Sequence, residues 1–77
     1  MNRIEIRTEY IKLKDLLKFS GEAESGGHAK RMIEDGEILL NGDRVILPGK
    51  KVKSGDIVTV GGREMQVVYE DQAYPST

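Results

Sequence analysis

The segment Ser25-Gly26-Gly27-His28 has the residue types and order of an anion-binding helix start. A serine can cap a helix, and the first amides of that helix lack internal partners and carry partial positive charge. Two glycines at this point would let a phosphate approach without obstruction by side chains. The alternative is a tight turn into the helix with Ser25 as its cap, because such starts are common. Lys30 and Arg31, one turn later, strengthen the phosphate interpretation, and both interpretations stay open.

Basic residues gather in two stretches, although the net charge of the whole chain is −1. Residues 12–33 carry a net charge of +2, and residues 44–53 carry +4 with no acid, whereas residues 34–43 carry −4. If the fold brings the two basic stretches together, the protein has a basic face and an acidic back. Two structural alternatives are a solvated helix face and an edge strand protected from aggregation. The cations concerned are Lys12, Lys14, Lys18, Arg44, Lys50, Lys51 and Lys53.

Catalytic and metal chemistry have few candidate groups in this chain. His28 is the only histidine and cysteine is absent, which excludes Cys–His catalysis, disulfides and metal sites built from these two residues. We therefore predict no enzyme activity, no metal and no cofactor. No apolar run approaches the roughly 18 residues of a membrane span, and a small domain without cysteines suits the reducing cytoplasm. The expected location is cytoplasmic, away from membranes.

Two helices should carry the first basic stretch. Leucines at i, i+3 and i+4 predict a short helix that begins at Leu13 and ends near Ser20-Gly21, after a strand around Ile4 and Ile6 that can extend to Thr8. A second stripe of Ala29, Met32 and Ile33 predicts a helix between the Ser25 cap and Gly36, which stands where a left-handed C-cap is expected. On this helix we also expect ion pairs between Lys30 and Glu34 and between Arg31 and Asp35.

The second half of the chain predicts strands. Asn41-Gly42 is typical of a type I′ hairpin turn, in which both central residues need positive φ, and Gly61-Gly62 is a second such signal. The predicted class is α+β, with two short helices packed on one small, mainly antiparallel sheet in the order β-α-α-β-β-β-β. Residues 1–70 should form a single domain, and residues 71–77 a flexible tail. The expected strand segments after the helices are 38–40, 43–46, 57–60 and 64–69, and residues 50–53 follow a break at Pro48-Gly49.

Taken in order, these signals resemble the alpha-L RNA-binding motif, the domain named after ribosomal protein S4 of the bacterial small subunit. The similarity covers about residues 12–60, and the preceding strand and the Ser-Gly-Gly segment are similar to small stand-alone members of the YaaA or YbcJ type. The segments that carry it are Leu13-Lys14-Asp15-Leu16-Leu17, Ser25-Gly26-Gly27-His28-Ala29-Lys30-Arg31-Met32-Ile33, Gly36-Glu37-Ile38-Leu39-Leu40-Asn41-Gly42 and Val52-Lys53-Ser54-Gly55-Asp56-Ile57-Val58.

The resemblance implies binding of structured RNA, ribosomal RNA above all, through the face formed by both helices and the hairpin. It also implies a role on the ribosome or on an assembly intermediate, and we expect a monomer. Many relatives have an arginine directly after the serine of the second helix, where this chain has Gly26, so that contact is either missing or made by backbone amides. The residues implied as RNA contacts are Lys12, Lys14, Lys18, Ser25, Gly26, Gly27, His28, Lys30, Arg31, Arg44, Lys50, Lys51 and Lys53.

Phosphate and shape recognition are expected rather than a platform of stacked bases, because the chain has only four aromatic residues. Two hypotheses from other classes stay open. One is a β-grasp-like carrier or protein-interaction module, since sulfur-carrier proteins end in Gly-Gly, although here residues 63–77 follow Gly62. The other is a domain that docks on a protein partner and no longer uses its RNA face.

Overall fold

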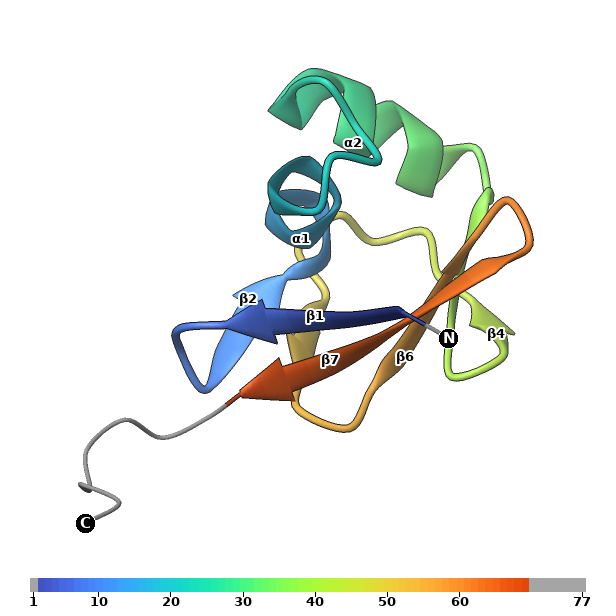
Figure 1. Ribbon diagram of the computed structural model, residues 1–77. Helices are drawn as coiled ribbons and strands as arrows, with labels where there is room; N and C mark the ends of the chain where they lie inside the picture. The colour runs from blue at the N-terminus through green and yellow to red at the C-terminus, as the bar shows by residue number, and fades with distance from the viewer. Residues whose placement is uncertain (1, 70–77) are drawn as a thin grey trace, which may run out of the picture.

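The computed structural model describes residues 2–69, in which two helices lie on one side of a sheet (Figure 1). The predicted α+β class is confirmed. The predicted tail at residues 71–77 lies outside the described residues. The elements are β1 (Asn2–Ile6), β2 (Tyr10–Lys12), α1 (Leu13–Phe19), α2 (Gly26–Glu34), β3 (Ile38–Leu40), β4 (Asp43–Arg44), β5 (Lys51–Lys53), β6 (Ile57–Val60) and β7 (Arg63–Tyr69).

The strands form two sheets, where one was predicted. Five strands are ordered β1-β7-β6-β3-β4, and β2 pairs with β5 in a separate antiparallel ribbon. All pairings are antiparallel except that of β1 with β7, which agrees with the mainly antiparallel prediction. The predicted element order lacked β2 and one of the five strands that follow the helices. Only Ile11 of β2 turns inward, and one apolar residue is too few for an alternating pattern to show.

The apolar stripes predicted for both helices are buried. Leu13, Leu16 and Leu17 of α1 are fully buried, and the stripe of α2 packs against them together with apolar residues from the strands. Such burial is the main source of stability for helices this short. The other buried apolar residues are Ile6, Ala23, Ala29, Met32, Ile33, Ile38, Leu40, Val52, Val58, Val60, Met65 and Val67.

The hairpin strand after Gly42 ends at Arg44 instead of continuing to residue 46 as predicted. The chain leaves the sheet there and runs to the start of α1, where it supplies two carbonyl acceptors. The amide of Leu13 donates to the carbonyl of Lys50 at 2.8 Å, and the amide of Lys14 donates to that of Pro48 at 3.1 Å. The first amides of α1, which has no side-chain cap, therefore hold the segment that precedes β5.

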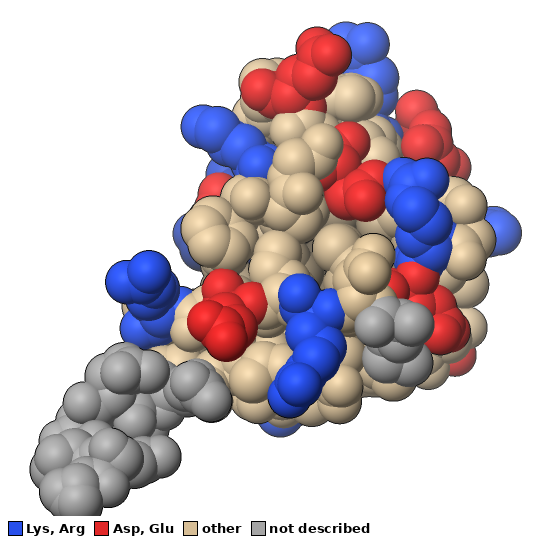
Figure 2. Space-filling view, viewed as in Figure 1, with Lys and Arg blue, Asp and Glu red and all other residues tan. Residues whose placement is uncertain are grey.

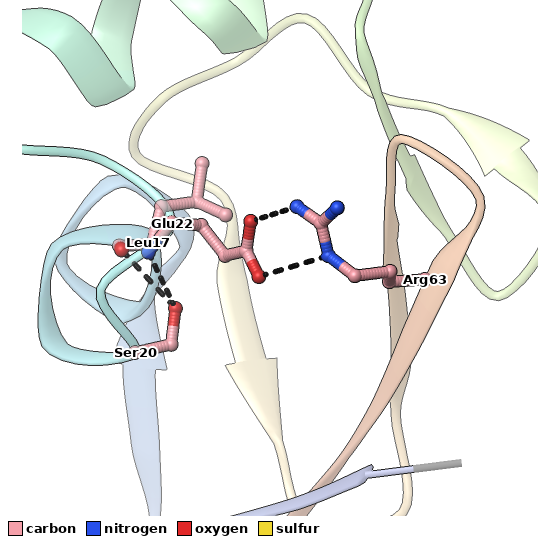
Figure 3. Close-up of polar contacts among 4 residues, drawn as sticks. All are labelled: Leu17, Ser20, Glu22 and Arg63. Atoms are coloured by element: carbon pink, nitrogen blue, oxygen red, sulfur yellow. Dashed lines mark hydrogen bonds and ion pairs between the residues drawn. The ribbon is translucent and has the colours of Figure 1, made fainter.

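A polar contact ties the loop between the helices to the hairpin of β6 and β7 (Figure 3). The guanidinium of Arg63 donates two hydrogen bonds to the carboxylate of Glu22, and this hydrogen bonding and charge raise the pKa of Arg63. On the same loop, the hydroxyl of Ser20 donates to the carbonyl of Leu17 at 3.1 Å and accepts the amide of Glu22 at 3.5 Å. The loop between the helices is thus fastened to the start of β7.

Replacing Gly36 by alanine should destabilise the fold by about 1–2 kcal/mol. Gly36 has φ of +79° directly after α2, and a Cβ there would lie 3.1 Å from Cδ of Arg44. Gly26→Ala is the matched control, because that position has open space and a helical backbone, where alanine is favoured by up to about 1 kcal/mol. Urea unfolding followed by circular dichroism measures both. Equal stabilities of the two variants would contradict this role of Gly36.

Candidate nucleic-acid interface

The ribbon of β2 and β5 brings the two basic stretches of the sequence together. Lys12 lies directly opposite Lys51, and Tyr10 lies opposite Lys53. Because side chains alternate along a strand and opposite residues share a face, these four side chains point to the same side. The other side carries Ile11 and the fully buried Val52. The ribbon therefore presents three lysines and one tyrosine to solvent.

Like charges in directly opposite positions destabilise a β ribbon, so the pair Lys12 and Lys51 works against folding. Neither lysine forms an ion pair with any described residue, whereas the ammonium of Lys53 lies 3.8 Å from the carboxylate of Asp56. A bound phosphate would remove the repulsion between Lys12 and Lys51. The ring of Tyr10, which lies under the ammonium of Lys51, only partly offsets this repulsion, so both lysines are suited to bind an external anion.

The Asn41-Gly42 turn is joined to the lysine strand by side-chain hydrogen bonds. The amide nitrogen of Asn41 donates to the carboxylate of Asp56 at 3.1 Å, and the other oxygen of that carboxylate accepts the backbone amide of Lys53 at 2.9 Å. The side-chain oxygen of Asn41 also accepts the amide of Ile57 at 2.8 Å. With φ of +53° at Asn41 and +88° at Gly42, the predicted type I′ turn is formed.

A surface hollow lies between this hairpin and the lysine strand. Its lining includes Asn41, Asp43 and Val45 on one side and the three lysines of residues 50–53 on the other. The hairpin thus stands beside the lysines that it was expected to present. Arg44 does not line this hollow, since its side chain lies against Gly36 near the end of α2. A cation at this position also stabilises the helix, because the C-terminal end of a helix carries partial negative charge.

The start of α2 has two unused backbone donors. Ser25 caps the helix as predicted: its hydroxyl accepts the amide of His28 at 3.1 Å. The amides of Gly26 and Gly27 have no hydrogen-bond partner within residues 2–69, and a side chain at Gly26 would meet open space. Neither glycine has positive φ, so the backbone conformation does not require glycine at either position.

His28 is oriented at the same helix start. Its Nδ1 accepts the amide of Glu24 at 3.1 Å, so in the neutral ring the proton is on Nε2. The ring is exposed and therefore presents an N–H donor to solvent. Gly26, Gly27 and His28 thus leave three N–H donors free at the start of this helix.

The remaining predicted cations lie on the exposed surface of the helices. Lys18, Lys30 and Arg31 are exposed, and Lys14 is half-buried. The ion pairs expected between Lys30 and Glu34 and between Arg31 and Asp35 do not form: within the described segment, only Lys53–Asp56 and Glu22–Arg63 are paired. Both cations of α2 are therefore unpaired. The face drawn in Figure 2 carries acidic and basic side chains side by side, so the expected segregation of charge does not extend to this side.

Two other kinds of site find no support in residues 2–69. No group of three histidine, cysteine, aspartate or glutamate side chains there could hold a metal ion. Neither of the two helices has the length and apolar character needed to cross a membrane.

Comparison with known proteins identifies the fold. The family model of the S4 domain matches residues 4–68, which is most of the chain. The chain belongs to the S4 domain family. The alpha-L motif predicted from the sequence is thereby confirmed, and the match also includes β1, β2 and β7, which lie at or beyond the ends of the predicted core.

Several relatives of this S4 domain have similar length. The probable ribosome maturation protein RlbA of Bacillus subtilis is 38% identical over 61 residues, which are 79% of this chain and 86% of the relative. The putative RNA-binding protein YbcJ of Escherichia coli is 36% identical over 59 residues, 77% of this chain and 84% of YbcJ. This S4 domain is therefore similar to short proteins of which the match covers most of the length.

Solved structures agree with this assignment. The solution structure of YbcJ from Escherichia coli, described as revealing an alfaL motif involved in RNA-binding, superposes with a TM-score of 0.67 at 32% identity. The superposed region covers 88% of this chain and 87% of the YbcJ chain. Ribosomal protein S4e of Thermoplasma acidophilum superposes with a TM-score of 0.64 at 24% identity, over 88% of this chain and 36% of S4e. The likeness to S4e concerns the fold alone.

Proposed function

We propose that this S4 domain binds structured RNA, above all ribosomal RNA, through phosphate contacts and that it acts on the ribosome or on an assembly intermediate. The observation that carries the proposal is the pair Lys12 and Lys51, which lie opposite each other and form no ion pair with any described residue. The names of RlbA and YbcJ, which refer to ribosome maturation and to RNA binding, support the same conclusion. The protein would work as a cytoplasmic monomer, with residues 1–70 as one RNA-binding domain around a core at 12–60.

The proposed interface has two parts. One is the ribbon with the adjoining lysines Lys14, Lys18 and Lys50, and the other is the start of α2 with its free amides, His28, Lys30 and Arg31. Among the proposed RNA contacts, Arg44 is expected to contribute least, because its side chain already packs at the end of α2. Binding alone accounts for these groups, and the S4 domain is a binding domain rather than a class of enzyme, so we propose no catalytic activity.

A salt titration tests the proposal directly. About five phosphate contacts would give a slope of log K against log salt of roughly −3.5 to −4.5. Fluorescence anisotropy of labelled ribosomal RNA fragments measures it, with a single-stranded oligonucleotide of equal length as the control. A flat titration, or equal affinity for both kinds of RNA, would refute phosphate binding of structured RNA.

Gly26→Glu should separate RNA binding from folding. The first turn of α2 has no acidic residue, so a carboxylate there should stabilise the helix by about 0.3–1 kcal/mol. The same charge would repel a phosphate at the amides of Gly26 and Gly27, and we expect affinity to fall about tenfold. Gly26→Ala keeps the amides and adds no charge, so its affinity should stay near wild type. Unchanged binding by Gly26→Glu would remove the helix start from the interface.

The carrier hypothesis loses support from the position of Gly61-Gly62. Both glycines have positive φ in the turn between β6 and β7, and β7 pairs with β6 on one side and β1 on the other. Cleavage after Gly62 would remove a strand from the interior of the sheet. Mass spectrometry of the protein from cells tests this: a species ending at Gly62 would revive the carrier hypothesis.

A further inference from the structure

Tyr10 is an exposed aromatic side chain on a surface of charged groups. It is 47% exposed, and its hydroxyl makes no hydrogen bond with the described part of the chain. The ammonium of Lys51 lies 4.7 Å from the centre of its ring, a cation–π contact that orients the ring. Packing of the core does not need this tyrosine, since the inward side chain of β2 is that of Ile11.

A hollow opens beside the ring of Tyr10. Its lining consists of Thr8, Tyr10, Ile11, Lys12 and Asp15, and Lys51 is not part of it. Tyr10 therefore borders the hollow, whereas Lys51, whose ammonium lies over its ring, does not. The residues that line the hollow thus include an aromatic residue, a cation and an acid.

These groups match the parts of an unpaired nucleotide. Aromatic side chains stack on bases that are not stacked within an RNA helix. A lysine at the edge can bind the phosphate of the same nucleotide. A carboxylate accepts hydrogen bonds from the N–H groups of a base edge, and guanine presents two neighbouring donors, N1–H and the exocyclic amino group.

The unpaired negative charge of Asp15 favours recognition of a base over binding of phosphate alone. It forms no hydrogen bond or ion pair with other described residues, and its negative charge lies among Lys12 and other cations of the interface. In a surface for phosphates alone, this charge would weaken binding. Its position in the first turn of α1 is favourable for the helix, but that benefit does not require a hollow beside a tyrosine.

We propose that this hollow binds one unpaired nucleotide of the RNA, with the base stacked on Tyr10 and its N–H edge donating to Asp15. Guanine fits best. The inference rests on the proposed function and adds to it a specificity: the protein recognises a bulged or looped-out base next to a helical stem. Lysine contacts hold the backbone, and Tyr10 with Asp15 selects the place on the RNA.

A set of RNA hairpins tests the inference. All share one stem, which is either fully paired or carries a single bulged G, A, C or U, and affinity is measured by fluorescence anisotropy. Wild type should bind the bulged-G stem about five- to a hundredfold more tightly than the paired stem, from the usual contribution of one stacked base. Tyr10→Leu should abolish this preference and Tyr10→Phe should keep it. Phe19→Leu, which changes another exposed aromatic residue at the end of α1, is the matched control and should leave the preference intact.

Asp15→Asn tests the base edge separately. It should reduce the difference between bulged G and bulged U, while binding of the paired stem becomes tighter because a negative charge is lost. Equal affinity of wild type for paired and bulged stems, together with a steep salt dependence, would overturn the inference and leave the proposed function standing. Absence of binding to every stem would overturn the proposed function and this inference with it. A preference that survives in Tyr10→Leu would overturn the role of Tyr10.

Discussion

Reversal of Lys12 and Lys51 to glutamate is expected to lower the affinity for ribosomal RNA fragments by about a hundredfold at low salt, roughly tenfold for each lysine. The two side chains lie opposite each other and share one face of the ribbon, so a single phosphate group can contact both. Losing two contacts should also reduce the slope of log K against log salt by about 2. Fluorescence anisotropy at several salt concentrations measures affinity and slope together.

The double reversal should leave the fold intact. It replaces one pair of like charges by another, so the repulsion across the ribbon stays about the same, while the cation–π contact of Lys51 with Tyr10 is lost. Arg3→Glu is the charge-matched control for each single reversal, because Arg3 is exposed on β1 and outside the proposed interface. If Arg3→Glu weakens binding as much as Lys51→Glu does, the effect comes from net charge and the ribbon is not the site.

The single variant Lys12→Glu makes the sharpest distinction between folding and binding. A glutamate opposite Lys51 turns repulsion into attraction, which stabilises by about 0.2–1 kcal/mol, and it also places a negative charge at the start of α1. The contact between Lys51 and Tyr10 is kept. Thermal unfolding should therefore show a more stable protein that binds RNA less well, which a purely structural role of Lys12 does not predict.

Local patterns predicted the parts of this fold that depend on local physics. The stripes of Leu13, Leu16 and Leu17 and of Ala29, Met32 and Ile33 are buried, because the helical period alone decides which side of a helix is apolar. The Asn41-Gly42 turn formed as predicted, because its residue types are those that tolerate positive φ. In each case the signal lies within a few residues of the structure that it predicts.

Features that depend on distant residues could not be predicted in this way. The ribbon pairs residues 10–12 with residues 51–53, and nothing within either segment specifies the other. The predicted pairs of Lys30 and Arg31 within α2 do not form, whereas Glu22 pairs with Arg63, 41 residues away in sequence. Exposed ion pairs one turn apart are weak, so their absence costs the helix little.

In the candidate site, too, the residue types could be predicted from the sequence but their arrangement could not. Every lysine of the ribbon was expected to contact RNA, but only the register between β2 and β5 places Lys12 opposite Lys51 and next to Tyr10. The sequence contains no signal that marks Tyr10, because an aromatic residue beside a single isoleucine predicts neither a strand nor a site. The residue becomes a candidate once its exposure and its hollow are known.

The link between the hairpin and the lysine strand is expected to carry much of the stability of the interface. Asn41→Ala should destabilise the protein by about 2–4 kcal/mol. It removes both side-chain hydrogen bonds, leaves the carboxylate of Asp56 with one fewer donor, and places alanine at φ of +53°. Asp56 is only 9% exposed, so water replaces the lost donor poorly. For a protein of this size the melting temperature should fall by about 4–8 °C for each kcal/mol.

Asn41→Gly separates the two causes, because glycine accepts the positive φ but has no side chain to hold Asp56. The free energy of unfolding of Asn41→Gly should lie between that of the wild type and that of Asn41→Ala. RNA binding should weaken in both variants even below their melting temperatures, since Asp56 also accepts the amide of Lys53 and so holds the lysine strand beside the hairpin. If Asn41→Gly were as stable as wild type, the side-chain bonds would have no part in holding the strand, and the hairpin would be a turn and nothing more.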